Sequence, residues 1–341
     1  MTLADLGIVP GTCQVVAEIG PANGSLDYAA QAIAAAAESG CKFVKGQIYN
    51  RDTLTTRDAK PYGKGIAEAD TQWDNFEHQL TPEEWFDVAD ICAVAGVMFF
   101  ASVFDENAVD LCEDIDVPLY KIASADITHK RLIQYVAATG KPIVLSTGGA
   151  TMDEIDRALS WAFAVRPCEV VVMICTLAYP TPLDQAHVAR VKFWTSHDWA
   201  VGYSDHTMGI SAMCTARAYG AVLIEKHFTI TPGAGGDHDF ALAPVAMDWF
   251  HGMPSDELGP APEVIGSPTI GRLAVEEAAV TQARRSIAAA VDIEAGTPIT
   301  ESMLSFLRPG TGIPPFMVDE PDGPVGRSYP QTIAAGSLLP N

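Results

Sequence analysis

Two histidines close neighbouring strand-like runs in the second half of the chain. His206 follows the run Trp199–Ser204, and His227 ends the run Ala221–His227. The segment between them, Gly209–Tyr219, has the small and apolar composition of a helix. A strand–helix–strand unit is a crossover with parallel strands, so both imidazoles emerge at one edge of the sheet. Imidazole is a common ligand of divalent metals, and the pair therefore predicts a metal site.

Further metal-ligating groups lie near the two histidines in the sequence. They are Asp205, Glu225 and the pair Asp237-His238. The alternative interpretation of one histidine at a strand end is a hydrogen-bonded structural residue. A matched pair at equivalent ends of neighbouring strands favours the metal site.

Two lysines lie within or beside other apolar runs. Lys45 and Lys121 are costly to bury there unless an anion meets each ammonium group. Hydroxyls and a glycine turn accompany them, at Ser124 and at Ser146-Thr147-Gly148. Together these residues predict a cradle for a phosphate or carboxylate. Either lysine alone could equally be ion-paired or extend its ammonium group to solvent.

The elements that must position these residues repeat along the chain. Eight short β-branched or apolar runs precede about residue 255: Gln14–Glu18, Lys42–Gln47, Val97–Ser102, Leu119–Ala123, Pro142–Ser146, Glu169–Cys175, Trp199–Ser204 and Ala221–His227. Helical patterns separate most of them, including Asp27–Ser39, Pro82–Ala95, Met152–Val165 and Gly209–Tyr219. Capping boxes at Thr81 and Thr151 mark two helix starts. This α/β repeat predicts a (β/α)8 TIM barrel with reactive groups at the carboxyl ends of its strands. An open doubly wound sheet is the alternative.

The composition changes after the eighth run. Residues 1–255 form the predicted barrel, residues 256–283 a linker with a helix near Ile270–Ala283, and residues 284–341 a small β-rich module. In this module Arg308 precedes Pro309-Gly310, and such a stiff turn suits an arginine to recognising a carboxylate or a hydroxyl-rich ligand. A solvated surface charge is the alternative. The long segment Asn50–Gln79 is typical of a lid or of a solvated excursion.

Composition and charge exclude several classes of protein. Of the 341 residues, 48% are hydrophobic and 19% charged, which predicts a sizeable core. The net charge of −22 argues against nucleic acid or an anionic membrane as partner. The seven cysteines form no CxxC pair, which favours free thiols. Because the first residues also lack the features of a secretory signal, we expect a cytoplasmic protein.

The polar motifs, taken in order, resemble the sialic acid synthase family, which includes N-acetylneuraminate, pseudaminic acid and legionaminic acid synthases. The resemblance covers nearly the whole chain and rests on Ala17-Glu18-Ile19-Gly20, Val44-Lys45-Gly46-Gln47, Tyr120-Lys121-Ile122-Ala123-Ser124, Leu145-Ser146-Thr147-Gly148, Tyr179-Pro180-Thr181-Pro182, Gly202-Tyr203-Ser204-Asp205-His206-Thr207, Ile224-Glu225-Lys226-His227-Phe228 and Arg308-Pro309-Gly310. The module from Arg284 on is similar to the family's antifreeze-like (SAF) domain.

The resemblance implies an enzyme, a transferase that condenses phosphoenolpyruvate with an N-acyl aminohexose such as N-acetylmannosamine. The products would be a nine-carbon 2-keto sugar acid and phosphate. It also implies Mn²⁺ or Mg²⁺ as cofactor, and a homodimer in which the SAF domain of one subunit covers the active site of the other.

The same resemblance assigns roles to individual residues. His206 and His227 correspond to the metal ligands, and Glu18 to the catalytic carboxylate. The phosphoenolpyruvate ligands correspond to Lys45, Lys121, Ser124, Ser146 and Ser204. The sugar contacts correspond to Gln47, Tyr179 and Asp237, with Arg308 reaching the N-acyl group across the dimer interface.

The chain departs from the family pattern at four places. The segment Pro21-Ala22-Asn23-Gly24 lacks a histidine, Ile174 replaces another histidine, and Gly149 stands where Met is common. Leu177 replaces a Ser or Asn that binds phosphoenolpyruvate; losing one hydrogen bond to a charged ligand costs about 1.5–3 kcal/mol. We interpret these changes as marks of a divergent acceptor specificity. A barrel lyase or isomerase that uses a metal, and a non-catalytic sugar-binding barrel, are the alternatives.

Overall fold

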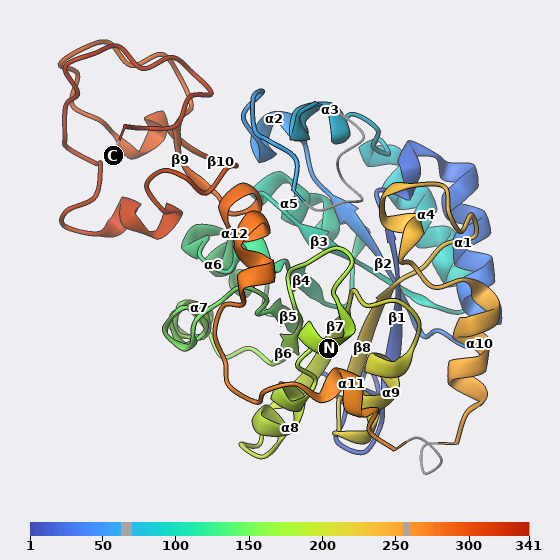
Figure 1. Ribbon diagram of the computed structural model, residues 1–341. Coiled ribbons are helices and arrows are strands. Elements are labelled where there is room, and N and C mark those ends of the chain that lie inside the picture. Colours follow the sequence, from blue (N-terminus) through green and yellow to red (C-terminus); the bar gives the residue numbers. More distant parts are fainter. Residues whose placement is uncertain (63–69, 255–258, 341) are drawn as a thin grey trace.

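The computed structural model describes residues 1–62, 70–254 and 259–340. Its main body is a closed barrel of eight parallel strands in the order β1 to β8, surrounded by helices (Figure 1). A smaller module, drawn in red, follows at the C-terminal end. The closed barrel confirms the predicted (β/α)8 fold and excludes the open doubly wound sheet. The predicted boundary between residues 255 and 256 lies outside the described residues.

Every predicted strand forms, with ends that differ by at most two residues. The strands are β1 (Gln14–Gly20), β2 (Phe43–Ile48), β3 (Met98–Val103), β4 (Tyr120–Ile122), β5 (Ile143–Ser146), β6 (Val170–Ile174), β7 (Ala200–Asp205) and β8 (Leu223–His227). Strand β1 closes the barrel by pairing with both β2 and β8. In this register Glu18 lies directly between Lys45 and His227.

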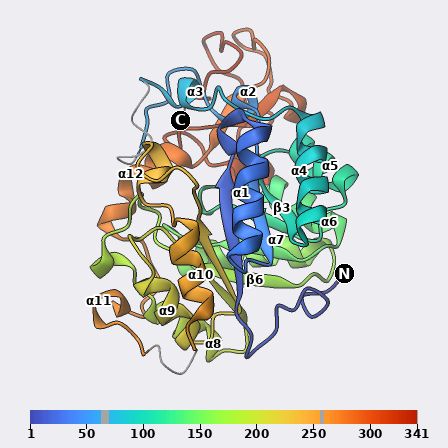
Figure 2. The ribbon, with the colours of Figure 1, turned by 90° about the vertical axis from the view of Figure 1, so that its right-hand side faces the viewer.

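Helices cover the outside of the barrel. They are α1 (Leu26–Glu38), α4 (Pro82–Ala95), α5 (Glu106–Ile115), α6 (Lys130–Thr139), α7 (Met152–Val165), α8 (Ala189–Thr195), α9 (Ser211–Ala218) and α10 (Pro244–Gly252). The capping boxes predicted at Thr81 and Thr151 are both present at the starts of α4 and α7. Helix α1 packs between α4 and α10 on one side of the barrel (Figure 2). No helix in the described ranges is both long and apolar enough to cross a bilayer.

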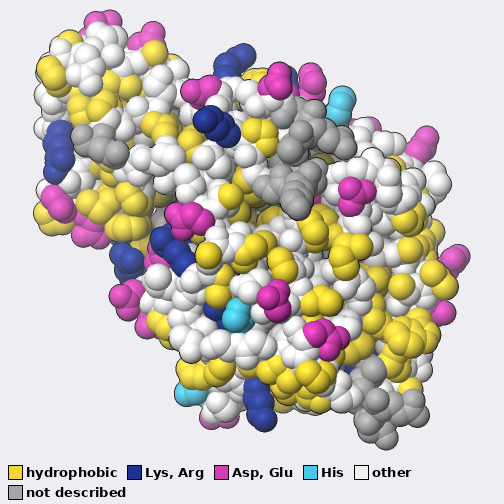
Figure 3. Space-filling model, in the orientation of Figure 1, with side chains coloured by type: hydrophobic (Ala, Val, Ile, Leu, Met, Phe, Trp, Pro, Cys, Tyr) yellow, Lys and Arg dark blue, Asp and Glu magenta, His cyan; other side chains and the backbone are white. Residues whose placement is uncertain are grey.

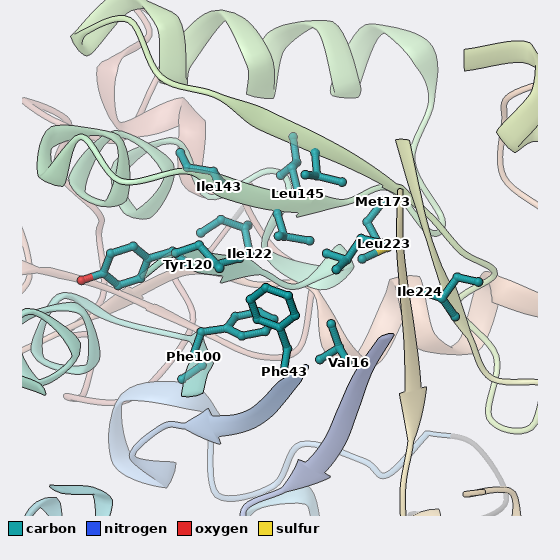
Figure 4. Packing of buried hydrophobic residues seen from close by; sticks show 14 of the residues in the cluster. Val16, Phe43, Phe100, Tyr120, Ile122, Ile143, Leu145, Met173, Leu223 and Ile224 are labelled. Atoms are coloured by element: carbon teal, nitrogen blue, oxygen red, sulfur yellow. The ribbon is translucent and has the colours of Figure 1, made fainter. Parts of the chain in front are cut away.

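Large apolar side chains fill the barrel (Figure 4). The rings of Phe43 and Phe100 meet edge to face with centroids 6.1 Å apart, and burying each such side chain contributes about 1.5–3 kcal/mol. On the outer face of the barrel, a Cβ atom on Gly46 of β2 would lie 2.6 Å from Trp85 Cζ3 of α4. The glycine between Lys45 and Gln47 therefore allows α4 to pack closely on β2.

The linker contains two short helices, α11 (Pro262–Ile265) and α12 (Glu277–Ala283), with a 3₁₀ turn η5 (Ala274–Glu276) just before α12. The predicted helix Ile270–Ala283 was too long at its start. Gly271 has φ +157°, which a helix does not accommodate.

The C-terminal module has little regular structure. Strands β9 (Ser286–Ala289) and β10 (Leu304–Leu307) pair antiparallel, and turns and short 3₁₀ segments make up most of the rest. Its own apolar core includes Ile287, Ile293 and Ile333. The long segment after β2 carries α2 (Arg51–Leu54) and α3 (Gln72–Asn75), while residues 63–69 of it lie outside the described residues. The seven cysteines are all free, as the sequence predicted.

Candidate active site

A cavity of about 570 Å³ lies at the carboxyl ends of the strands. Every residue that the sequence predicted for the site is on its wall: Glu18, Lys45, Gln47, Lys121, Ser124, Ser146, Tyr179, Ser204, His206, His227, Asp237 and Arg308. They come from the barrel strands, from the loops that follow them and, in the case of Arg308, from the C-terminal module.

Strand alternation decides which side chains reach this cavity, because successive residues point to opposite faces. Ser204 and His206 face the cavity, whereas Asp205 between them does not line it. The Asp205 carboxylate instead accepts a hydrogen bond of 2.9 Å from Nζ of the fully buried Lys226. The prediction that Asp205 lies with the metal ligands was therefore wrong.

The two buried lysines of the cavity wall, Lys45 and Lys121, each form ion pairs with carboxylates of the protein. Lys121 Nζ donates to both oxygens of Glu225, at 2.9 and 2.8 Å. Lys45 Nζ donates to Ser102 Oγ at 2.9 Å and lies 3.4 Å from Glu18 and 3.9 Å from Glu225. Burial raises the pKa of Glu225, but the charges of Lys121 and Lys45 outweigh it and lower this pKa to about 2. Glu225 therefore stays ionised between the two lysines.

Hydroxyl groups surround the same two lysines. Ser204 Oγ donates to Glu225 at 3.0 Å. Ser124 Oγ accepts the backbone N–H of Gly148 at 3.0 Å, and its oxygen is 3.1 Å from Cys175 Sγ. A small anion entering here would meet ammonium groups and hydroxyl donors together, which is the donor set that phosphate and carboxylate groups require.

The two histidines face each other across a short gap. Their ring centroids are 5.5 Å apart. His206 Nδ1 donates to the Thr176 carbonyl at 3.0 Å, and His227 Nδ1 lies 3.3 Å from Asp237 Oδ2. In each ring the Nδ1 atom is engaged, which fixes the ring and directs Nε2 to a different partner.

The protonation of His206 suits a metal ligand. Burial, together with the charge of His227, lowers the pKa of His206 to about 4. Its ring is therefore neutral at pH 7, which is the form that binds metals. Burial also lowers the pKa of His227, but the carboxylate of Asp237 outweighs burial and the net shift is upward.

The ligand set around this pair is small. Across residues 1–62, 70–254 and 259–340, no group of three or more His, Cys, Asp or Glu side chains converges as a metal site would require. A cation held by His206 and His227 would therefore take its other ligands from water or substrate oxygens. Open coordination positions of this kind are what a catalytic metal needs, so the residues fit a catalytic rather than a structural cation.

Glu18 is held at the cavity wall between Lys45 and His227. Its Oε1 atom accepts the backbone N–H of Gly20 at 2.9 Å and Gln47 Nε2 at 3.0 Å. A register shift in β1 between Glu18 and Gly20, where Gly20 has φ +63°, points this N–H at the carboxylate. A carboxylate so fixed can orient a water molecule or take its proton.

Arg308 forms the outer part of the cavity. Its Nη1 atom donates to Tyr62 OH at 3.2 Å, and the guanidinium carbon lies 5.4 Å from the Phe76 ring centroid and 5.7 Å from that of Phe104. The side chain is buried, with 3% of its surface exposed. In this single chain Arg308 lines the cavity at the barrel mouth. That it does so across a dimer interface, as the resemblance implied, stays a prediction.

Sequence reasoning missed the aromatic wall around Arg308. Its members are Tyr49, Tyr62, Phe76 and Phe104, with Leu54 beside them. Three of these five residues come from the segment Asn50–Gln79, whose length indicated a lid but whose sequence singled out no side chain. His238, which follows Asp237 in the sequence, also lines the cavity, and its Nε2 atom lies 3.2 Å from Asn23 Nδ2.

The four departures from the family pattern fall in different surroundings. Ile174 is buried in the barrel core and does not line the cavity. Leu177 does line it, where it packs against Val280. Gly149 has φ +64° and donates its N–H to Glu276 at 2.7 Å. Asn23 adds a polar group to the cavity wall.

The fold and the site together define a (β/α)8-barrel protein whose strand ends bring two buried lysines and several hydroxyl groups together beside a pair of histidines. Comparison with known proteins assigns the chain more closely. It belongs to the NeuB family, whose profile matches residues 32–251, and its last residues, 284–341, match the SAF domain.

Curated relatives and solved structures agree with this family. The chain is 31% identical to the N,N'-diacetyllegionaminic acid synthase of Legionella pneumophila, over 96% of this chain and 93% of that protein. It is 30% identical to the pseudaminic acid synthase of Helicobacter pylori, over 90% and 91% of the two chains. The crystal structure of the Bacillus subtilis spore coat polysaccharide biosynthesis protein SpsE superposes with a TM-score of 0.80 at 27% identity, covering 96% of this chain and 94% of that one.

Proposed function

We propose that this chain is a sugar-acid synthase that condenses phosphoenolpyruvate with an N-acyl aminohexose, giving a nine-carbon 2-keto acid and phosphate. The observation that carries the proposal is the presence of Lys45 and Lys121 in one cavity with His206, His227 and Glu18. The names of the relatives, which are synthases of legionaminic and pseudaminic acid, support the product class.

Phosphoenolpyruvate carries a phosphate and a carboxylate on three carbons, so it needs several cationic donors close together. Lys45 and Lys121 supply the ammonium groups, and Ser124, Ser146 and Ser204 supply hydroxyl donors on the same wall. Burial lowers the pKa of Lys121, and the charge of Glu225 opposes this shift before the ligand arrives. The arriving anion then shares the donors that Glu225 holds in the free protein.

The acceptor sugar lies beyond the histidine pair. A divalent cation, Mn²⁺ or Mg²⁺, held by His206 and His227 would polarise the aldehyde oxygen as a Lewis acid. Gln47, Tyr179 and Asp237 offer polar contacts to the sugar hydroxyls. The volume of about 570 Å³ is within the range of small-molecule sites and has room for both substrates.

The residues then carry out the chemistry around the new bond. Carbon 3 of phosphoenolpyruvate attacks the aldehyde carbon, and carbon 2 is left electron-deficient. Water adds to carbon 2, and Glu18 orients this water and takes its proton. The aldehyde oxygen takes up a proton and becomes a hydroxyl group. Phosphate then leaves with the electrons of its bond to carbon 2, and the hydroxyl group that water placed on carbon 2 gives up its proton, which generates the 2-keto group.

Arg308 and its aromatic wall fit the N-acyl group of the acceptor. The guanidinium can donate to an amide carbonyl, while Phe76 and Phe104 offer apolar surface to the acyl methyl. Because most of this wall is aromatic, an acceptor with an apolar substituent fits it better than one with a charged phosphate.

The experiment that tests the proposal follows phosphate release. The protein is incubated with Mn²⁺, phosphoenolpyruvate and a panel of N-acetylmannosamine, its 6-phosphate and 2,4-diacetamido-2,4,6-trideoxyhexoses. We expect release that requires both substrates, with a nine-carbon 2-keto acid detected by mass spectrometry, and none from His206→Ala. Binding of phosphoenolpyruvate without release for any aldose would favour a binding barrel. Conversion of a sugar without phosphoenolpyruvate would favour a lyase or isomerase.

A further inference from the structure

Two charged residues that the proposed function does not use lie behind the histidine pair. Lys226 and Asp205 alternate along β8 and β7 with residues of the cavity wall, so their side chains point to the outer face of the barrel. Figure 3 shows charged side chains scattered over the surface of one face of the molecule, where water solvates them. The side chains of Lys226 and Asp205, in contrast, have no exposed surface and form an ion pair of 2.9 Å.

A gain in stability does not explain why this pair is buried. Two charges lose their hydration when they are buried, and an apolar pair of similar volume often stabilises a fold as well or better. Buried pairs are retained in some proteins because they fix one arrangement of the neighbouring elements. The hydrogen bonds of Lys226 and Asp205 show which elements are fixed here.

Main-chain pairing between β7 and β8 ends just before the first histidine. The last pair of residues in this ladder is Asp205 with Lys226. His206 follows in the sequence and lies beyond the ladder. His227, in contrast, is still paired, with Glu18 of β1. The position of His206 relative to His227 therefore depends on contacts other than the pairing of their strands.

The buried ion pair supplies such contacts, and they converge on Thr207, the residue after His206. Lys226 Nζ donates to Asp205 Oδ2 at 2.9 Å and also to the carbonyl of Thr207. The other oxygen of Asp205 accepts the Thr207 N–H at 2.8 Å. Both main-chain polar groups of Thr207 are thus held, and Lys226 connects them to the strand that carries His227.

Two further hydrogen bonds hold His206 to the segment after β6. Its Nδ1 atom donates to the Thr176 carbonyl at 3.0 Å, and its own carbonyl accepts the Thr181 N–H at 2.9 Å. These bonds orient the ring, while the ion pair joins the chain beyond β7 to β8. The two sets of contacts therefore act on different aspects of the site.

We propose that Lys226 and Asp205 are positioning residues of the histidine pair, and that their buried ion pair sets the gap between the rings of His206 and His227. This inference rests on the proposed function in treating the two histidines as ligands of a divalent cation. With two protein ligands, the gap between them decides how well the cation is held. Removing a residue that positions a metal ligand without touching the metal typically weakens metal binding about 10–100-fold.

The test uses a double variant and a matched control, whose folding is checked by thermal unfolding. Lys226→Met alone leaves a buried carboxylate without its partner, which can prevent folding. The double variant Lys226→Met/Asp205→Asn leaves neither charge of the pair, and the Asn side chain can still accept the Thr207 N–H. It should therefore fold and lack only the link to β8. Tyr203→Phe is the control, because it removes another buried hydrogen bond of β7, from Tyr203 OH to the Ala186 carbonyl at 3.1 Å.

Crystal structures without metal give the first readout. The ring centroids of His206 and His227 are 5.5 Å apart in the wild type. We expect this distance to change by more than about 0.5 Å in the double variant, which is the tolerance within which a functional site must be held. It should stay the same in Tyr203→Phe. An unchanged distance in the double variant would overturn the proposal.

Mn²⁺ binding, measured by calorimetry, gives the second readout. The Kd for Mn²⁺ should rise about 10–100-fold in the double variant and keep its wild-type value in Tyr203→Phe. Phosphoenolpyruvate without Mn²⁺ should stabilise the double variant as much as the wild type, because Lys45 and Lys121 lie on other strands, β2 and β4. A double variant with the wild-type Kd for Mn²⁺ would overturn the proposal. A wild-type chain that binds no Mn²⁺ would contradict the proposed function, and the distance between the rings in the crystal structures would then decide the inference.

Discussion

The buried ion pair between Lys121 and Glu225 should contribute measurably to the free energy of unfolding. The change Glu225→Gln removes the carboxylate that accepts two hydrogen bonds, at 2.9 and 2.8 Å, from the Lys121 ammonium group. Lys121 is only 3% exposed, so water from the cavity replaces the lost partner only in part. Breaking one side of such a buried pair costs about 3–5 kcal/mol. We expect a loss of this size in the free energy of unfolding, measured by urea denaturation at pH 7.

The change Lys121→Met should destabilise the protein by a similar amount, because it leaves Glu225 with fewer donors. The double variant should lose less than the sum of the two single losses, by about 1–3 kcal/mol, since neither charge is then left alone. Additive losses would show that the two residues do not act as a pair.

The stabilisation that phosphoenolpyruvate gives on binding shows whether Lys121 and Glu225 bind the ligand or only stabilise the fold. A ligand at 100 times its Kd stabilises the folded state by about 2.7 kcal/mol. We expect this increase in unfolding free energy for the wild type. The increase should be at least as large for Glu225→Gln, because Lys121 has lost its carboxylate partner there, and it should be small for Lys121→Met. The matched control is Lys226→Met, which breaks another buried pair, with Asp205, outside the lining of the cavity. The reasoning is refuted if Lys121→Met gains as much from phosphoenolpyruvate as Lys226→Met does.

Three further predictions concern other parts of the molecule. His206→Ala removes one of two imidazoles, so Mn²⁺-dependent phosphate release should disappear and Mn²⁺ binding by calorimetry should weaken; full activity would contradict the metal assignment. Arg308→Ala should raise the KM for the acceptor sugar about ten- to a hundredfold and change the KM for phosphoenolpyruvate little, because a hydrogen bond to a charged group contributes about 1.5–3 kcal/mol. Burial alone raises the pKa of Glu154, but the hydrogen bond and charge of Arg284 outweigh it and lower the pKa from 4.5 to about 2. The stability that Glu154 provides is therefore present above pH 4.5 and lost as the pH falls towards 2, so the difference in unfolding free energy between wild type and Glu154→Gln should shrink over this window; a constant difference would contradict the pairing.

The sequence predicted the barrel and most of its site because both depend on local patterns. Alternating strands and capped helices can be recognised from neighbouring residues, and the carboxyl ends of parallel strands meet by topology. This reasoning placed His206, Lys45 and Glu18 together, and all three line the cavity. Asp205 was misplaced because proximity in sequence does not say which face of a strand a side chain occupies.

The rest of the site depends on contacts between distant segments, which local patterns do not encode. Tyr62 and Phe76 surround Arg308 only because the module folds back onto the segment after β2. The reason for Gly149 and Leu177 likewise becomes visible only when Val280 of α12 packs against both positions. From the sequence alone, these two residues were departures from a pattern without a structural reason.

The most direct test of the account is a crystal of the protein grown with Mn²⁺ and phosphoenolpyruvate, with data collected at the manganese absorption edge. The account predicts one anomalous peak between the imidazoles of His206 and His227, and the phosphate or carboxylate of the ligand in contact with Lys45 and Lys121. Manganese bound elsewhere, or phosphoenolpyruvate that touches neither lysine, would contradict it.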